Sequence, residues 1–482
     1  MSFAWAQTSA TQLNWKSICS DSTGQYLAAV VQNGGIYTST NGGLNWTQRT
    51  SGLPTTASWQ YICSDSTGQY LAAVVSGGRI YNSTNGGLNW NQQTSGLPTT
   101  ANWSSICSDS TGQYLAAAVF DGSVYTSTNG GLNWTQSVPY IGAKLFVICS
   151  NSTGTKLIVP AYGSGICLVI SNDGGLNWSG ITAASSGLTT SINWSSICSD
   201  STGQYLAAVV YGGRIYTSTN GGLIWTQRTS GLPTTANWCS ICSDSTGQYL
   251  AAVNNVALYI SINGGLNWNQ QTSGLPSTAN WNSICSSQNG TTLAAVVING
   301  NIYKGLYIQY PCFKEDSVIL TDKGYRPIQD LRKGDLVKTL RNGFLPINMI
   351  GKRDIVHFAN KNERIKDQLY KCAQDNFNEV FEPLILTGCH SILVDDFISE
   401  EQRQKTIEVN GNTYVTDNKY RLPACADERA IVYEMPGTYT IYHFALENDD
   451  YFMNYGVYAN GLLVETCSKR YLKELSNMEL IH

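Results

Sequence analysis

The chain has 482 residues, of which 42% are hydrophobic and 13% charged, and its formal net charge is −4 at pH 7. Its first 311 residues contain no glutamate and no histidine, and four lysines and four arginines there oppose seven aspartates. This balance excludes the basic face that nucleic-acid binding requires. No stretch approaches the roughly eighteen apolar residues of a membrane-spanning helix, so no membrane span is expected.

The first three hundred residues repeat one pattern with a period of roughly 44 residues, the length of a four-stranded propeller blade. Runs of β-branched and aromatic residues alternate with Gly, Asn and Asp, which is typical of antiparallel strands joined by tight turns. An Ile-Cys step recurs seven times, at Cys19, Cys63, Cys107, Cys149, Cys198, Cys242 and Cys285. A Trp-containing strand closes six repeats, at Trp46, Trp90, Trp134, Trp178, Trp225 and Trp268. We therefore predict a seven-bladed β-propeller over residues 1–308.

The two ends of the repeat region complement each other. The seventh repeat stops at Tyr303–Tyr307 without a Trp strand, whereas the chain begins with an extra one, Phe3–Gln7, which matches Leu44–Gln48. We expect the N-terminal strand to complete the last blade. Such a closure leaves no free edge at which the ring could open.

The turn before each closing tryptophan resembles the Asp-box (BNR repeat) of sialidase-like and photosystem-assembly-factor-like propellers. Ser171–Trp178 matches Ser-x-Asp-x-Gly-x-x-Trp in full. Asparagine replaces the aspartate at Asn41, Asn85, Asn129, Asn220 and Asn263. We interpret the box as a structural turn, because it recurs once per blade. A sialidase site needs clustered arginines and a Tyr/Glu pair, so sialidase activity is not expected, and the propeller is predicted to be a platform for protein or glycan partners.

The cysteines indicate the compartment. One cysteine at the same place in each blade cannot pair with its equivalents across a ring, so we interpret these residues as small buried apolar side chains. The first residues lack the basic start and apolar run of a signal peptide. We expect synthesis in a reducing cytoplasm.

The composition changes abruptly at Tyr310–Cys312. All thirteen tryptophans lie before this point and all four histidines lie after it. A change of this kind marks a domain boundary. We predict a second domain over residues 309–468 and a short helix or tail over residues 469–482. The charged segment Lys361–Glu382 is predicted to be helix-prone.

The second domain resembles the Hint (hedgehog/intein) superfamily. The resemblance is carried by Cys312–Thr321, by Leu384–Val394 with its Thr-x-x-His signature, and by Tyr442–Glu447 followed by Tyr458–Cys467. It implies a β-rich fold, so the whole chain is expected to be all-β. It also resembles the Hint domains of large DNA viruses of protists, which implies that the protein could be a virion component.

The Hint resemblance implies a chemistry. Cys312 would attack the carbonyl of Pro311 and convert that peptide bond to a thioester by an N-to-S acyl shift. His390 would donate a proton to the leaving amide nitrogen, and Thr387 would orient the amide. His443 occupies the place of an assisting aspartate in many inteins, and is either a second acid/base or structural. A water or another nucleophile would then release the propeller.

Three departures from the family pattern limit this activity, and His443 in place of the assisting aspartate is the first of them. Inteins end in His-Asn before a nucleophile, whereas this chain has Glu465 and Thr466 before Cys467. Splicing is therefore not expected, and N-terminal cleavage remains. Pro311 is a hindered acyl donor where hedgehog proteins have glycine. A hedgehog function would also need a sterol-recognition region after the Hint core, where this sequence has Ser468–His482, so sterol transfer is not expected.

Two alternatives stay open beside autoprocessing. The first is a non-cleaving structural or interaction protein, for example a virus particle component, that retains an inactive Hint domain. The second is a propeller that binds a glycan or protein independently of the Hint domain. Neither hypothesis needs a cofactor. Cys312, Cys389 and His390 supply only two thiols and one imidazole, so no metal is expected.

Overall fold

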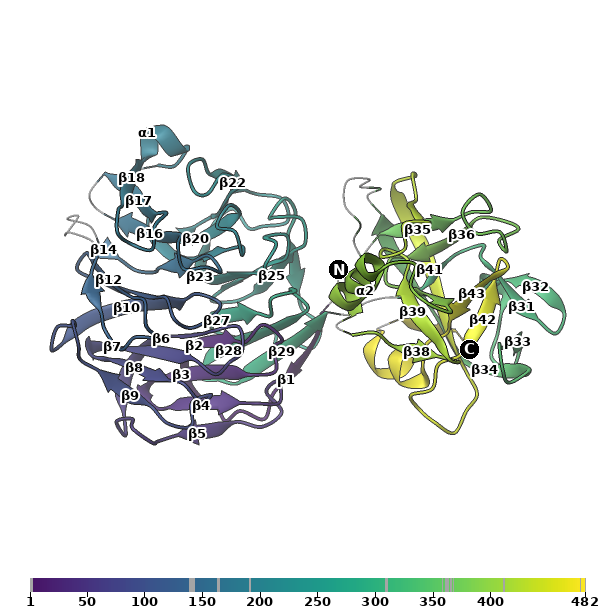
Figure 1. The fold of residues 1–482 in the computed structure, drawn as a ribbon, viewed down its shortest axis with the longest axis horizontal. Coiled ribbons are helices and arrows are strands. Elements are labelled where there is room, and N and C mark those ends of the chain that lie inside the picture. The colour runs from purple at the N-terminus through teal and green to yellow at the C-terminus, as the bar shows by residue number, and fades with distance from the viewer. Residues whose placement is uncertain are drawn as a thin grey trace. The chain divides into compact units, whose positions relative to one another are not determined.

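The computed structural model describes residues 3–137, 144–162, 165–189, 192–307, 311–357, 359, 364, 366, 368–410, 412–476 and 478–481. The chain divides into two compact units, Met1–Tyr307 and Ile308–His482, called unit 1 and unit 2 below. Strands dominate the regular structure of both units (Figure 1), and the predicted all-β class is confirmed. No described helix is long and apolar enough to cross a membrane.

The described strands of unit 1 form seven antiparallel groups of four. The first three groups are β2–β5 (Leu13–Ser20, Leu27–Gly34, Ile36–Ser39, Thr47–Arg49), β6–β9 (Ala57–Ser64, Leu71–Gly78, Ile80–Ser83, Asn91–Gln93) and β10–β13 (Ala101–Ser108, Leu115–Val119, Ser123–Ser127, Thr135–Gln136). The next three are β15–β18 (Cys149–Ser150, Leu157–Tyr162, Ile166–Ser171, Ser179–Thr182), β19–β22 (Trp194–Ser199, Leu206–Gly213, Ile215–Ser218, Thr226–Arg228) and β23–β26 (Ala236–Ser243, Leu250–Asn254, Leu258–Ser261, Asn269–Gln271). The last joins β27–β29 (Trp281–Ser286, Thr292–Gly300, Ile302–Tyr307) to β1 (Phe3–Gln7). Strand β14 (Lys144–Leu145) pairs with β16, and helix α1 (Ala183–Ser186) follows β18.

These groups are arranged in a closed ring. The innermost strands contact one another in the order β2, β6, β10, β15, β19, β23 and β27, and β27 contacts β2 again. The N-terminal strand β1 pairs antiparallel with β29, with Phe3 opposite Tyr307 and Gln7 opposite Tyr303. The last four-stranded group is therefore built from both ends of unit 1.

Side-chain hydrogen bonds shape the turn before each closing tryptophan. The Ser171 hydroxyl accepts the Gly175 N–H at 2.8 Å, and Asp173 Oδ1 accepts the Asn177 N–H at 2.9 Å. The backbone and side-chain donors of Asn177 lower the pKa of Asp173 to about 2. Asn41 Oδ1 accepts the equivalent Asn45 N–H, also at 2.9 Å. Asparagine can replace aspartate in this turn, because the N–H four residues further on needs only one side-chain oxygen as its acceptor, and both side chains have one.

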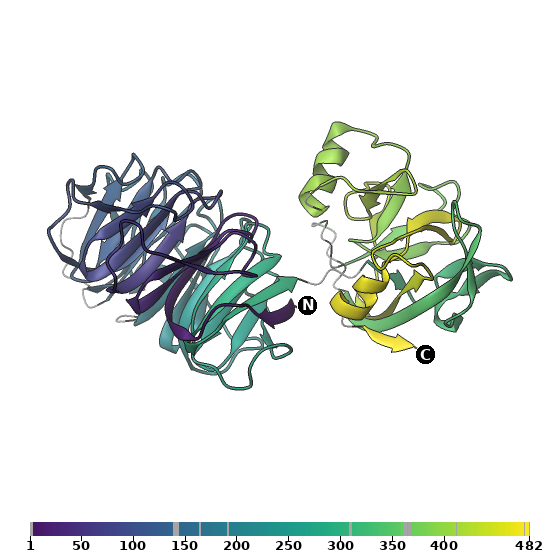
Figure 2. The same cartoon turned by 90° about the horizontal axis from the view of Figure 1, so that it is seen from below.

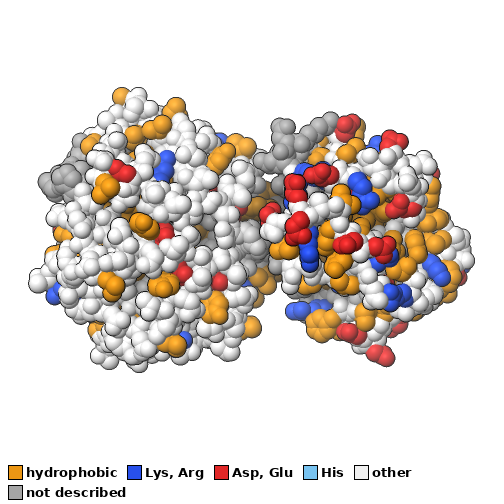
Figure 3. Space-filling view, in the orientation of Figure 1, with side chains coloured by type: hydrophobic (Ala, Val, Ile, Leu, Met, Phe, Trp, Pro, Cys, Tyr) orange, Lys and Arg blue, Asp and Glu red, His pale blue; other side chains and the backbone are white. Residues whose placement is uncertain are grey.

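The core of unit 1 is built from repeated aromatic contacts. Each of six innermost strands contributes a fully buried tryptophan that packs edge-on against a tyrosine of the third strand, as Trp15 does on Tyr37 with ring centroids 5.2 Å apart. Leu145 takes this place in the remaining group. Lys, Arg, Asp and Glu side chains are sparse on the visible surface of unit 1 and dense on that of unit 2 (Figure 3).

The described strands of unit 2 form one antiparallel sheet system, in which neighbouring strands do not follow chain order. Thirteen of them lie in the order β38-β39-β37-β43-β42-β31-β33-β34-β41-β30-β36-β35-β40, while β32 pairs with β31 and β44 with β34. The longest pair is β34 (Phe344–His357) with β41 (Gly437–Leu446). The other strands are β30 (Phe313–Lys314), β31 (Val318–Thr321), β32 (Gly324–Pro327), β33 (Leu336–Lys338), β35 (Leu369–Cys372), β36 (Leu384–Thr387), β37 (Ser391–Val394), β38 (Val415–Thr416), β39 (Lys419–Pro423), β40 (Ile431–Val432), β42 (Gly456–Ala459), β43 (Leu462–Glu465) and β44 (Glu479–Ile481). A 3₁₀ turn (Ile328–Asp330) and helix α2 (Glu400–Asn410) complete unit 2.

Unit 2 differs from the sequence expectations in its helices and its last residues. The tail contains one helical turn, Tyr471–Leu475, and then β44, which pairs with β34 and is the yellow C-terminal arrow in Figure 2. The strand was not predicted, because a three-residue strand has no recognisable period. Within the segment expected to be helix-prone, residues 361–363, 365 and 367 lie outside the described part, and the described part contains strand β35. Helix α2 lies after this segment and begins at Glu400.

Candidate functional site

Cys312 lies where the chain enters the sheet of unit 2. The following residue, Phe313, starts β30 and pairs with Leu386 of β36 on one side and with Tyr442 of β41 on the other. This insertion between two strands leaves Cys312 with no exposed surface. The thiol is therefore enclosed by protein rather than presented to solvent.

Thr387 contacts the peptide group that precedes the Cys312 side chain. The Cys312 N–H donates to Thr387 Oγ1 at 2.8 Å, and the Thr387 N–H donates to the Cys312 carbonyl at 3.0 Å. The threonine is itself 3% exposed. Its hydroxyl thus fixes the plane of the amide between Pro311 and Cys312, which is the bond that the sequence analysis singled out.

His390 follows in the tight turn that leaves β36, where its N–H donates to the Thr387 carbonyl at 2.9 Å. The ring is fully buried and packs on Phe313, with centroids 4.3 Å apart. Neither ring nitrogen has a hydrogen-bond partner of ordinary geometry among the described residues. Desolvation lowers the pKa of His390 to about 3, and backbone groups of Glu465, Pro311 and Cys312 only partly offset the shift. The imidazole is therefore neutral at neutral pH and lies close to the Pro311–Cys312 peptide.

His443 lies on β41, next to His390. The two ring centroids are 5.1 Å apart, and His443 is 1% exposed. Burial first, and then the charge that His390 would carry, hold the pKa of His443 well below its usual value. Since two neighbouring imidazolium ions would repel each other in this buried place, at most one of them is expected to take up a proton during a reaction.

Two further thiols lie near Cys312. Burial is the main cause that raises the Cys312 pKa well above its usual value, and the neighbouring thiols of Cys389 and Cys467 add to it. The Cys389 thiol points to Thr387 Oγ1 at 3.8 Å, and the Cys467 thiol donates to the Phe444 carbonyl at 3.3 Å. No described group of three or more His, Cys, Asp or Glu side chains is arranged to hold a metal ion. All fourteen cysteines lie in described residues and none forms a disulfide.

Glu465 and Thr466 stand where inteins carry the His-Asn pair, and both side chains are engaged in hydrogen bonds within unit 2. Glu465 Oε1 accepts hydrogen bonds from Thr416 at 2.6 Å and from Asn454 at 2.9 Å, and pairs with Arg421 at 2.7 Å. The Thr466 hydroxyl accepts the Tyr455 N–H at 2.9 Å. Neither side chain offers an amide nitrogen that could attack the chain downstream.

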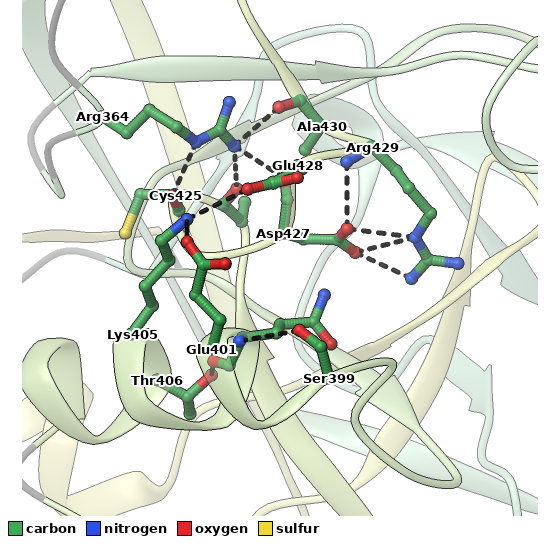
Figure 4. Close-up of polar contacts among 12 residues, drawn as sticks. Arg364, Ser399, Glu401, Lys405, Thr406, Cys425, Asp427, Glu428, Arg429 and Ala430 are labelled. Atoms are coloured by element: carbon green, nitrogen blue, oxygen red, sulfur yellow. Dashed lines mark hydrogen bonds and ion pairs between the residues drawn. The ribbon is translucent and has the colours of Figure 1, made fainter.

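A loop behind the His390 turn holds it in place, and sequence reasoning missed it. The Ala424 N–H donates to the His390 carbonyl and the Cys425 N–H to the Gly388 carbonyl, both at 2.9 Å. Arg364 in turn donates to the carbonyls of this loop, at Ala424, Cys425, Asp427 and Ala430, over 2.6–3.1 Å (Figure 4). The guanidinium of Arg364 also lies over the Tyr370 ring, 5.0 Å from its centroid. Contacts of an arginine with backbone carbonyls carry no motif, so no signal in the sequence could have revealed them.

Comparisons with known proteins agree with this division. Residues 311–469 match the family model described as Hint domain. Three solved structures resemble the chain at 12–16% identity: YCF48 bound to D1 peptide (16% identity, TM-score 0.51, 63% of this chain and 96% of that one), the RRP9 WD40 repeats (12%, 0.50, 63% and 97%) and the GH74 xyloglucanase from Xanthomonas campestris (13%, 0.51, 80% and 68%). No curated protein matches the sequence. The chain therefore combines a unit of β-propeller-like fold with a Hint domain.

Proposed function

We propose that unit 2 is an autoprocessing module that cleaves the Pro311–Cys312 bond through a thioester, without splicing. The observation that carries this proposal is the 2.8 Å hydrogen bond from the Cys312 N–H to Thr387 Oγ1, with the neutral, buried His390 beside the same peptide. The resemblance of residues 311–469 to Hint domains supports it.

The first step is an N-to-S acyl shift. Cys312 Sγ attacks the Pro311 carbonyl carbon, and the thiol proton passes to the His390 imidazole. The imidazolium then gives this proton to the Cys312 nitrogen as the C–N bond breaks, so that a thioester and a free amine result. Burial leaves both imidazoles unprotonated but also lowers their basicity, so His390 holds the thiol proton only transiently and passes it on, as a strong acid, to the Cys312 nitrogen. Burial also raises the pKa of the Cys312 thiol and therefore keeps it protonated.

The second step opens the thioester. Water or an added thiol attacks the Pro311 carbonyl, and the Cys312 sulfur leaves and is protonated. The N-terminal fragment then ends at Pro311, and the C-terminal fragment begins at Cys312. Because Cys312 has no exposed surface, we expect this step to be slow with water alone and faster with a small strong nucleophile. The contacts of Glu465 support the absence of a splicing step.

The released part would be a seven-bladed propeller of the Asp-box type, a reading supported by the closed ring of innermost strands and by the turn contacts of Ser171 and Asp173. The absence of glutamate and histidine from residues 1–311 argues against a sialidase-type activity in it. The competing hypothesis is a non-cleaving structural protein, for example a virus particle component, in which the Hint fold serves packing alone.

The test is intact-mass measurement of freshly purified protein with and without dithiothreitol and hydroxylamine. We expect two fragments that meet between Pro311 and Cys312, and a Pro311 hydroxamate when hydroxylamine is present. Cys312→Ala should abolish the fragments, and Thr387→Val should slow their formation roughly 10- to 100-fold, because it removes the acceptor of the scissile N–H.

Cys372→Ala is the matched control, because Cys372 is an equally buried thiol of unit 2 that lies on β35. This variant should cleave like the parent chain. One unchanged mass for the parent in every condition would contradict autoprocessing and leave the non-cleaving hypothesis.

A further inference from the structure

A cavity of about 540 Å³ lies at one end of the innermost strands of unit 1. It is lined from all seven four-stranded groups, with polar and apolar surface in nearly equal parts. This is the size of a pocket that encloses a small organic ligand. Amide and hydroxyl side chains line much of it, among them Gln60, Ser76, Asn102, Ser104, Asn193, Ser195, Tyr211 and Asn282.

One repeat position, directly after the buried tryptophan, supplies the variable part of this lining. In six groups this residue is the extra residue of a β-bulge, as in the step between Trp15 and Ser17. A bulge re-aims the side chain that it carries. Around the ring the position holds Lys16, Gln60, Ser104, Phe146, Ser195, Cys239 and Asn282, while the Ile-Cys step after it does not change. Side-chain diversity is thus concentrated where the chain faces the cavity.

Most residues at the next position also line the cavity. In five groups it is a serine that binds the neighbouring group, as when the Ser240 hydroxyl accepts the Ile284 N–H at 3.3 Å. Tyr61 and Val147 replace this serine and lose that bond. Tyr61 lines the cavity, and burial and the thiols of Cys63, Cys107, Cys149 and Cys198 raise its pKa. At these two positions the side chain lines the cavity and makes no bond to the described isoleucine of the neighbouring group.

The cavity has two chemically different sides. Lys16 is the single charged side chain among the described lining residues, and it lies on the first innermost strand. Phe146 belongs to the fourth of seven groups, so it lies across the ring from Lys16. Phe120 packs on Phe146 with centroids 5.3 Å apart, and both rings line the cavity. Lys144 Nζ lies over the Phe120 ring, 5.2 Å from its centroid, but does not line the cavity. The lining on this side is therefore aromatic and suits an apolar group, whereas the Lys16 side suits an anion.

From this arrangement we propose that the cavity binds a carboxylate carried on an apolar body, with the carboxylate on Lys16 and the apolar body on Phe120 and Phe146. Such a ligand can be the apolar carboxyl-terminal end of a peptide chain or a free apolar acid. The amide side chains between the two sides hydrogen-bond the polar middle of the ligand. This binding does not depend on cleavage after Pro311.

Calorimetric titration of the full-length chain tests the proposal, with Cys312→Ala in parallel so that binding is measured apart from cleavage. The probes are N-acetyl-Leu-Phe with a free carboxylate, the same dipeptide as its amide, and phenylbutyrate. We expect saturable binding of both acids and about tenfold weaker binding of the amide, the size of one charge-assisted hydrogen bond. Tighter binding of the dipeptide acid assigns a peptide end, and tighter binding of phenylbutyrate assigns a free acid.

Two variants introduce a residue that already occurs at the same position of other repeats. Lys16→Ser and Phe146→Ser copy the residue that Ser104 and Ser195 carry at the same position, so the fold accommodates them. We expect Lys16→Ser to weaken the acids about tenfold without affecting the amide. Phe146→Ser should weaken acid and amide alike. Lys304→Gln is the control cation, because its ammonium lies near Asp21 at the other end of β2.

Equal affinity for acid and amide, an unaltered affinity in Lys16→Ser, or no saturable binding at millimolar concentration would each overturn the proposal.

Discussion

At the scale of single residues, burial is the main cause of the low pKa values of His390 and His443. Two imidazoles with ring centroids 5.1 Å apart, both almost without exposed surface, have pKa values far below those of histidines in water. Perturbed groups of this kind cluster at functional sites, although structural burial produces them too. His390 lies near the backbone of Pro311 and Cys312, as the proposed proton transfer requires.

Burial of His390 predicts a pH-dependent stability of unit 2. The folded pKa is about 3, whereas an unfolded histidine titrates near 6.5. Between these values only the unfolded chain binds the proton, so the contribution is complete above pH 6.5 and is lost as the pH falls toward 3. We expect the free energy of unfolding of unit 2 to fall by about 1.4 kcal/mol per pH unit below pH 6.5 from His390 alone.

Urea unfolding between pH 7.5 and 5 measures this slope, since few carboxylates titrate in that range. All thirteen tryptophans precede Cys312, so tryptophan fluorescence follows unit 1, and a circular-dichroism transition that fluorescence does not show follows unit 2. His390→Gln should lower the slope by about 1.4 kcal/mol per pH unit and leave the part that comes from His443, whereas Cys372→Ala should keep the slope of the parent. An equal slope in the parent and His390→Gln would show that His390 is not the cause.

At the scale of elements, the innermost strands of unit 1 are joined by repeated serine hydroxyls. Five serines accept the N–H of an isoleucine in the neighbouring group, at Ser17, Ser105, Ser196, Ser240 and Ser283. Each bond is buried, so each removes a polar group that would otherwise be left without a partner. The same strands carry the bulged residues that line the cavity. The innermost strands therefore both join neighbouring groups and form the proposed ligand site.

Removal of one such hydroxyl should be measurable. Ser240→Ala leaves the buried Ile284 N–H without an acceptor, so we expect the free energy of unfolding of unit 1 to fall by about 1–3 kcal/mol. Urea unfolding followed by tryptophan fluorescence is the readout. Ser185→Ala, at an exposed serine of α1, should change the midpoint little. A midpoint for Ser240→Ala equal to that of the control would mean that another group or water satisfies Ile284.

At the scale of the whole molecule, the ring of unit 1 is completed by its own N-terminus. Strand β1 covers the edge of β29 over five paired residues, and Trp5 and Phe3 are buried there. Without β1 the edge of β29 would be unpaired, and an exposed edge is prone to pair with another chain.

Deletion of residues 1–8 should therefore lower the unfolding midpoint of unit 1 and promote self-association. A synthetic peptide of residues 1–9 added in trans should bind saturably and restore the midpoint. The same peptide with Trp5→Ala is the control and should bind more weakly, because it lacks the buried ring. Light scattering and tryptophan fluorescence measure both effects. A deletion variant as stable and monomeric as the parent would contradict a closing role for β1.

Sequence reasoning was most successful where the information is local. The all-β class followed from the repeated strand and turn pattern, because hairpin turns are encoded within a few residues, as in Ser171–Trp178. The pairing of Phe3–Gln7 was expected only because that segment matches an internal repeat. The missed elements, α2 and β44, have no repeat or motif to mark them, and β44 is stabilised by its pairing with β34.

By itself, then, the sequence determined an all-β chain with a repeat of fixed period and an abrupt change of composition before Cys312. It nominated Cys312, Thr387, His390 and His443 by resemblance to Hint domains, with no distance among them. The tertiary structure alone decided that the Cys312 N–H meets Thr387 across 75 residues of chain, that Arg364 supports the His390 turn, and that seven repeat positions line one cavity. The physical reason is that turns depend on neighbours in sequence, whereas these contacts depend on sheet register and ring closure, which bring distant residues together only in the folded chain.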